Sequence, residues 1–189
     1  MVRLRSSKST TRCVCAAGAV SLATLSCSGT PNASSTVTIL EPAYAEFVGG
    51  GSNGSGVHTF LENQCGTLDC HGQVGRPLRL YSVDGLREPN EAGLISGAGA
   101  LTPSELYANF LSVVGLTPEE LNRVVEGLDP PTQLLLLQKP LGLVSHKGGV
   151  RILQSNLDPM YVCLTTWLEA PSGEAAFNAA ACTQAAELP

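Results

Sequence analysis

Cys65-Gly66-Thr67-Leu68-Asp69-Cys70-His71-Gly72 is the stretch with the most specific chemical pattern in the sequence. Four residues separate its two cysteines, and a histidine directly follows the second. Cysteines that bond haem normally have two residues between them and are followed at once by an iron-ligating histidine. The stretch therefore predicts covalent attachment of haem c to Cys65 and Cys70, with His71 as an iron ligand. The wider gap requires a bulged loop, for which Gly66 supplies backbone freedom.

Two other interpretations of these residues remain open. The cysteines could form a disulfide in an exported protein, and the chain would then carry no cofactor. Zinc fits less well, because a structural zinc site usually takes four Cys or His ligands in two close pairs. No second such pair lies in the globular part of the sequence.

Segments on both sides of the motif extend the pattern. They are Phe60-Leu61-Glu62-Asn63-Gln64, Arg76-Pro77-Leu78-Arg79-Leu80-Tyr81, Leu136-Leu137-Gln138-Lys139-Pro140, His146-Lys147-Gly148-Gly149 and Asp158-Pro159-Met160-Tyr161 continuing to Trp167-Leu168. With them, residues 57–170 resemble a cytochrome c domain of the planctomycete type. The resemblance implies a helical, exported, single-haem domain that transfers electrons, but it implies no substrate.

We expect a mainly α fold, a small single-haem cytochrome c-like domain with long loops. Thr102-Pro103-Ser104-Glu105 and Thr117-Pro118-Glu119-Glu120 each place Thr at the N-cap, Pro at N1 and Glu at N3, so each predicts a helix that begins with a capping box. Further helices are expected at 57–64, from Asp158-Pro159 onward, and over about 174–187. The domain then spans 57–189 and ends in a helical hairpin.

The first 56 residues are expected to precede this domain. Residues 1–26 have the basic, then apolar, then small-residue build of a signal peptide, and the apolar run is too short to span a bilayer. Cys27 follows in a context that resembles lipoprotein processing, which predicts a lipid anchor; ordinary cleavage that leaves Cys27 free is the alternative. Residues 27–56 have the composition of a flexible tether, although the apolar island at 37–40 and 44–48 could pack on the domain. The expected location is the bacterial cell envelope, on the periplasmic side of a membrane, or outside the cell.

The charge balance limits the partners. The formal net charge is −5, and removal of the four basic residues in 1–26, where there is no acid, makes it −9. So acidic a domain is not expected to bind nucleic acid. The expected partners are a redox protein of the envelope and, through the lipid anchor, a membrane.

The sixth iron ligand has two candidates. His146 lies in a Gly-rich loop that could close over the haem, and it is preferred to Met160, which lies on the apolar face of the last long helix. Arg76 and Arg79 could reach the haem propionates or could be ordinary surface charges.

Cysteine counting predicts one disulfide. Of seven cysteines, two leave with the signal peptide, Cys27 is the proposed lipid site, and two take haem. Cys163 and Cys182 remain, and in an oxidising compartment they are expected to pair. A buried free thiol at Cys163 is the alternative.

Three functions follow from these features. The first is an exported, lipid-anchored haem protein that carries electrons. The second is an accessory haem domain of an oxidoreductase or a small peroxidase, which is weaker because neither a Ser/His/Asp set nor a carboxylate pair is evident. The third is a cofactor-free structural or binding lipoprotein with a Cys65–Cys70 disulfide.

Overall fold

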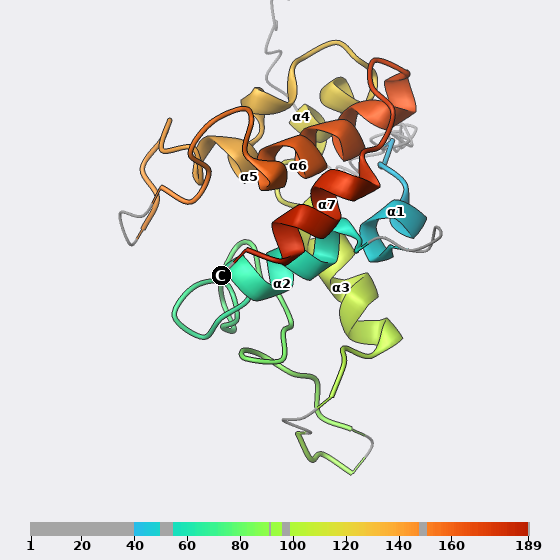
Figure 1. The fold of residues 1–189 in the computed structure, drawn as a ribbon. Coiled ribbons are helices and arrows are strands. Elements are labelled where there is room, and N and C mark those ends of the chain that lie inside the picture. Colours follow the sequence, from blue (N-terminus) through green and yellow to red (C-terminus); the bar gives the residue numbers. More distant parts are fainter. Residues whose placement is uncertain (1–39, 50–54, 91, 96–98, 148–150, 189) are drawn as a thin grey trace, which may run out of the picture. The chain divides into compact units, whose positions relative to one another are not determined.

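The computed structural model describes residues 40–49, 55–90, 92–95, 99–147 and 151–188 (Figure 1). These residues form a mainly helical body, as the sequence predicts. They contain no strand, only three isolated β-bridges in loops. The predicted signal peptide and Cys27 lie outside the described residues.

The helices follow one another with loops of very different length. In chain order they are α1 (Tyr44–Val48), α2 (Val57–Cys65), α3 (Pro103–Val114), α4 (Pro118–Val125), the 3-10 helix η1 (Pro131–Gln133), α5 (Leu135–Gln138), α6 (Pro159–Glu169), the 3-10 helix η2 (Ala170–Ser172) and α7 (Ala179–Ala186). The longest connection, between α2 and α3, carries the motif loop.

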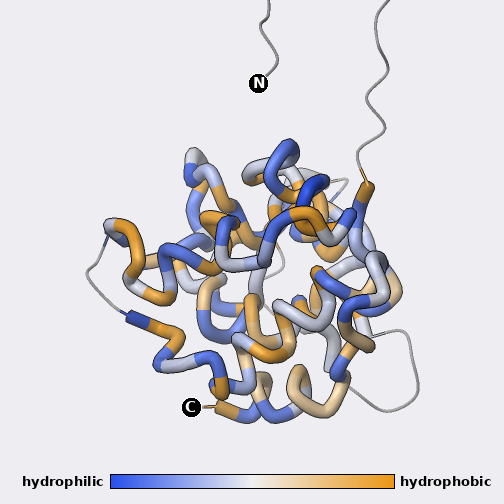
Figure 2. Tube along the Cα trace, turned by 90° about the horizontal axis from the view of Figure 1, so that it is seen from above, coloured by the Kyte–Doolittle hydropathy of each residue, from blue (hydrophilic) through white to orange (hydrophobic). Residues whose placement is uncertain are grey.

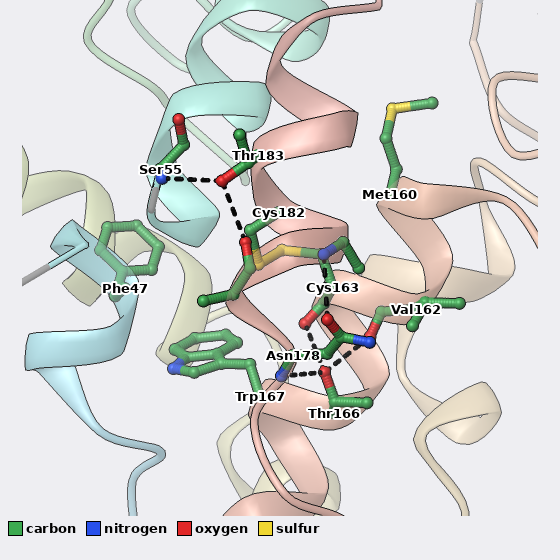
Figure 3. The surroundings of a disulfide bond; sticks show 12 residues. Phe47, Ser55, Met160, Val162, Cys163, Thr166, Trp167, Asn178, Cys182 and Thr183 are labelled. Atoms are coloured by element: carbon green, nitrogen blue, oxygen red, sulfur yellow. Dashed lines mark hydrogen bonds between the residues drawn. A yellow bond between two sulfur atoms is a disulfide. The ribbon is translucent and has the colours of Figure 1, made fainter. Parts of the chain in front are cut away.

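The C-terminal hairpin consists of α6 and α7, which pack against each other. Figure 3 shows the disulfide between Cys163 and Cys182 that joins them, with Cα atoms 4.8 Å apart. The predicted pairing is therefore confirmed, and the alternative of a free Cys163 thiol is wrong. Because the bond links residues 19 apart in sequence, the chain-entropy model gives a stabilisation of about 3 kcal/mol.

The two helices of the hairpin begin at polar caps. The carboxylate of Asp158 accepts a hydrogen bond of 2.9 Å from the backbone N–H of Met160, and α6 starts there as expected. The side chain of Asn178 accepts one of 3.0 Å from the N–H of Ala181. The last helix therefore starts at Ala179, later than the predicted 174.

The segment before α2 belongs to the folded body. Phe47 of α1 is fully buried, and its ring centroid lies 5.5 Å from those of Phe110 and Trp167. The indole N–H of Trp167 donates to the carbonyl of Ala43 at 3.0 Å. Residues 40–49, assigned to the tether from composition, thus pack on the domain, because Phe47 fills a space in its core.

Only one of the two predicted capping boxes forms. At α3 the Thr102 hydroxyl accepts from the N–H of Glu105, and the Glu105 carboxylate accepts from the N–H of Thr102. At α4 the side chain of Thr117 makes no capping hydrogen bond, with φ −146° and ψ 74°. The second prediction is wrong, because this backbone conformation differs from the extended one, φ −72° and ψ 158°, in which the Thr102 hydroxyl reaches the N3 amide.

A buried ion pair ties the loop before α3 to that helix. Arg87 and Glu105 form two hydrogen bonds, of 2.8 and 3.1 Å, and their side chains are 6% and 1% exposed. Burial alone would raise the pKa of Glu105. Hydrogen bonds from Arg87 and from the N–H groups of Thr102 and Glu88 outweigh this effect, so its pKa is lowered to about 2.

Figure 2 shows apolar and polar residues alternating along the helices. Their apolar faces meet in one core cluster, which includes Leu137, Trp167 and Leu168, all fully buried. Among the described residues, none of the helices combines the length and the apolar character that crossing a membrane requires.

Replacement of Glu105 by Gln should lower the free energy of unfolding by about 3–5 kcal/mol, because Arg87 stays charged and buried without its partner. The pKa of Glu105 falls from its ordinary 4.5 to about 2 on folding, so its ionised form stabilises the protein fully above pH 4.5. This stabilisation is lost as pH falls from about 4.5 towards 2. Urea unfolding across this window checks both effects, with exposed Glu119→Gln as the control. Equal costs for the two variants at pH 7 would contradict the prediction.

Candidate haem site

The motif loop starts at the last residue of α2, Cys65, and folds back on itself. The N–H of His71 donates to the carbonyl of Cys65 at 2.9 Å, and the N–H groups of Cys70 and Gly72 donate to that of Thr67 at 3.0 and 2.9 Å. These bonds close the gap of four residues into a compact turn with a cysteine at each end. The bulged loop expected from the sequence therefore forms.

Close backbone contacts explain the glycines of this region. A Cβ on Gly72 would lie 2.1 Å from the carbonyl oxygen of Gly66, and one on Gly85 would lie 2.0 Å from the same atom. Gly66 itself has an ordinary backbone conformation, with φ −81° and ψ 1°. A side chain does not fit at position 66, because a Cβ there would lie 2.6 Å from the carbonyl oxygen of Glu62. The expected role in backbone freedom is therefore replaced by one in packing.

The two cysteines of the motif are free thiols in different environments. Cys65 is half-buried, whereas Cys70 is exposed. Burial, and to a lesser degree the neighbouring Cys70, raises the pKa of the Cys65 thiol to about 12. Cys70 is thus the more accessible of the two thiols.

The imidazole of His71 is oriented by the chain that follows it. Its Nδ1 lies 2.8 Å from the carbonyl oxygen of Leu78, so Nδ1 carries the proton and donates it. The lone pair of the neutral ring is then on Nε2, the arrangement usual for metal-ligating histidines. Burial is the main cause that lowers the pKa of His71, which favours this neutral form.

Positive charges also lie near His71. The Leu78 hydrogen bond raises its pKa, whereas His146, Arg76 and Lys139 each lower it. In an acidic chain, these basic groups make the site locally positive.

The structure brings His146 to His71. The two ring centroids are 6.1 Å apart, and the ring planes are inclined by only 20°. The Nδ1 of His146 is buried and makes no hydrogen bond, so the protein leaves this nitrogen unused. Met160, the other candidate ligand, is 5% exposed on α6 and belongs to the hydrophobic core (Figure 3).

Arg76 and Arg79 line one cavity, of about 370 Å³, together with residues of α3. The Arg79 guanidinium lies 5.0 Å from the centroid of the Tyr81 ring. The Nε of Arg76 is buried without a hydrogen-bond partner. The sequence left open whether these arginines contact propionates or are ordinary surface charges, and their shared cavity comes from the fold.

Several residues that build the site escaped the sequence analysis. The carbonyl of Leu78 orients His71, and the amide of Asn109 holds the chain at Tyr81 on α3, with hydrogen bonds of 2.6 and 2.8 Å. A backbone carbonyl has no sequence signal. Asn109 had a weak one, as a polar residue among the apolar positions of a helix.

The donor set can be tested against the predicted cofactor. Among the residues that the structure describes, no three His, Cys, Asp or Glu side chains gather in a group that could hold a metal ion. Haem does not require such a group, because the porphyrin supplies the equatorial nitrogens and the protein supplies only axial ligands. Two imidazoles beside a pair of thiols fit this requirement.

Comparison with protein-family models, with curated proteins and with solved structures finds no match for this chain.

Replacement of Gly72 by Ala should lower the free energy of unfolding by roughly 3 kcal/mol, because the new methyl group meets the Gly66 carbonyl. Gly93→Ala is the matched control. Gly93 has open space around it and only a left-handed φ of 73°, so its cost should be about 1 kcal/mol. Urea unfolding midpoints measure the two. A Gly72→Ala variant no less stable than Gly93→Ala would contradict the packing argument.

Proposed function

We propose that this chain is an exported c-type haem protein that carries electrons in the cell envelope. Haem c is attached to Cys65 and Cys70, and its iron is held between His71 and His146. The observation that carries the proposal is the pair of nearly parallel imidazoles next to the two thiols.

The separation of the rings is in the range expected for two imidazoles that would hold one metal ion. An imidazole nitrogen binds a metal at about 2.0–2.1 Å, so two rings on opposite sides of one ion have centroids roughly 6 Å apart. The His71 and His146 centroids are 6.1 Å apart. An ordinary aromatic pair covers the same range, and spectra of the loaded protein distinguish the two cases.

Apolar side chains on the two site loops are also consistent with haem. In the motif loop, Leu68 and Val74 are 56% and 78% exposed, and in the His146 loop Leu143 is 64% exposed. A porphyrin has large apolar faces that such side chains would cover.

The chain's own residues would control the site in three ways. Leu78 orients His71 through its carbonyl. Arg76 and Lys139 place positive charge near His71, which favours the carboxylates of a haem. Bound haem would supply one-electron redox chemistry, and two imidazole ligands would give it a lower potential than a His/Met pair.

The position of His146 bears on the alternative functions. A peroxidase or an oxidoreductase accessory domain that acts on small molecules needs an open position on the iron, which a second imidazole would occupy. The carrier is therefore preferred to the enzyme. The alternative of a cofactor-free envelope lipoprotein was expected to have a Cys65–Cys70 disulfide, whereas both cysteines are free thiols in the structure; the haem stain described below distinguishes it from the carrier. The partner we propose is a redox protein of the envelope, with a lipid anchor on Cys27 holding the chain at a membrane.

Expression in a bacterial periplasm together with the haem-attachment machinery should give a chain that stains for haem after denaturing electrophoresis. Cys65→Ala/Cys70→Ala should abolish the stain, because no thioether bond can form. Cys163→Ala/Cys182→Ala is the matched control, which removes two cysteines but leaves the attachment site. If the unmodified chain does not stain for haem, the proposal of covalent haem attachment is wrong.

Replacement of His146 by Ala should convert a low-spin absorption spectrum into that of an open or water-ligated iron. Met160→Leu should leave the spectrum nearly unchanged, because it keeps the volume of a core side chain. If instead a thioether-to-iron band disappears in the Met160 variant, Met160 is the ligand.

Replacement of Cys27 by Ala should move the protein from the membrane fraction to the soluble fraction, because the lipid is attached at this thiol. Fractionation followed by haem staining measures the change. A parent chain that already fractionates as soluble argues against the anchor.

A further inference from the structure

The cavity between the loop after His71 and α3 has the donors of an anion site. Arg76 and Arg79 extend from the loop, and Ser112 lies on the helix. None of the described residues that line the cavity is acidic. Ion pairs within the described part of the chain join Arg87 to Glu105 and Arg123 to Asp129, and neither involves Arg76 or Arg79. Two arginines without acidic partners are unusual in a chain with a net charge of −5.

The walls of the cavity are held in place without a ligand. The backbone N–H of Arg79 donates to the Ser112 hydroxyl at 2.9 Å, which ties the loop to α3. The hydroxyl that accepts this bond keeps its own hydrogen for another acceptor. Gly75, with φ 85°, turns the chain just before Arg76.

The two guanidinium groups have unused donors. The Nε of Arg76 is buried and unpaired, which is rare for a buried polar group unless an absent partner belongs there. The guanidinium of Arg79 lies over the Tyr81 ring at 5.0 Å from its centroid. Because the flat face of the guanidinium contacts the ring, the N–H groups along its edge stay available as donors. Arginine N–H groups match the geometry of carboxylate and phosphate oxygens.

The remaining lining is apolar. Pro77, Ala108 and Leu111 contribute it, and Leu111 is 45% exposed. The cavity has a volume of about 370 Å³ and is open to solvent over much of its extent, so it would hold a small ligand against its wall and would not enclose it. The cavity therefore suits an anionic group that continues into a short apolar portion.

We propose that this cavity binds a carboxylate or phosphate group through Arg76 and Arg79. Two sources share this chemistry: a propionate of the attached haem, whose His71 ligand is near Arg76, and a free organic anion. The site is built from the chain's own residues, so it does not depend on haem attachment.

The test uses the full chain, labelled with ¹⁵N, in its unloaded and haem-loaded forms. Sodium butyrate and sodium phosphate are titrated at constant ionic strength, and the Nε–H signal of Arg76 and the amide signals of Leu111 and Ser112 are followed by NMR. We expect saturable shifts in the unloaded chain. Arg76→Gln/Arg79→Gln should weaken the affinity at least tenfold, as judged from the Leu111 and Ser112 amides. Arg123→Gln, which removes an exposed arginine elsewhere, should leave it unchanged.

The loaded form identifies the source of the anion. If a propionate fills the cavity, haem loading abolishes the butyrate shifts and gives magnetisation transfer between propionate protons and the Arg76 Nε–H. If the ligand is a free anion, the loaded chain binds butyrate as the unloaded chain does. The proposal is overturned if neither form shows a saturable shift and the loaded form shows no contact between haem and Arg76. An affinity that is unchanged in Arg76→Gln/Arg79→Gln also overturns it.

Discussion

The amide of Asn109 is the contact on which the geometry of the site depends. Buried at 2% exposure, it accepts from the N–H of Tyr81 and donates to the carbonyl of the same residue. An asparagine side chain has one acceptor and one donor group, so this pairing imitates a strand partner on the surface of a helix. It holds the chain at 78–81 on α3, and this segment carries the carbonyl that orients His71.

The same helix anchors the chain on the other side of that segment. Arg87 follows shortly after Tyr81 and enters the buried pair with Glu105, whose carboxylate also completes the cap of α3. A buried pair of this kind adds little net stability over apolar packing, but the loss of either partner is costly. It therefore acts mainly to specify one path for the long loop between α2 and α3.

The site combines a preformed turn, from Cys65 to His71, with a histidine from a loop far away in the sequence, His146. The turn from Cys65 to His71 is closed by its own hydrogen bonds and by glycine contacts, so the thiols and the first imidazole lie on a preformed loop. His146 comes from a distant loop whose position depends on the packing of α5 and α6. An iron held between two such loops would join them, which would couple cofactor binding to the stability of the body.

Much of the helical framework could be predicted from the sequence. Asp158 before Pro159 and the Thr102 capping box mark helix starts through local hydrogen bonds, which depend on residues a few positions apart. The same pattern at Thr117 did not form a cap, so a local residue pattern is not sufficient for one. The sequence left open whether Phe47, in a segment of tether composition, packs on the domain, because its burial depends on contacts with Phe110 and Trp167.

By itself, the sequence determined the chemistry available to this protein: two thiols next to His71, a second histidine in a loop, and two cysteines left for the disulfide that formed. These are properties of residue types and of short spacings. Only the tertiary structure decided that His146 rather than Met160 lies beside His71, and that Arg76 and Arg79 share one cavity. The reason is physical: such contacts join residues far apart in the chain, so their geometry depends on how whole helices pack and not on any local pattern.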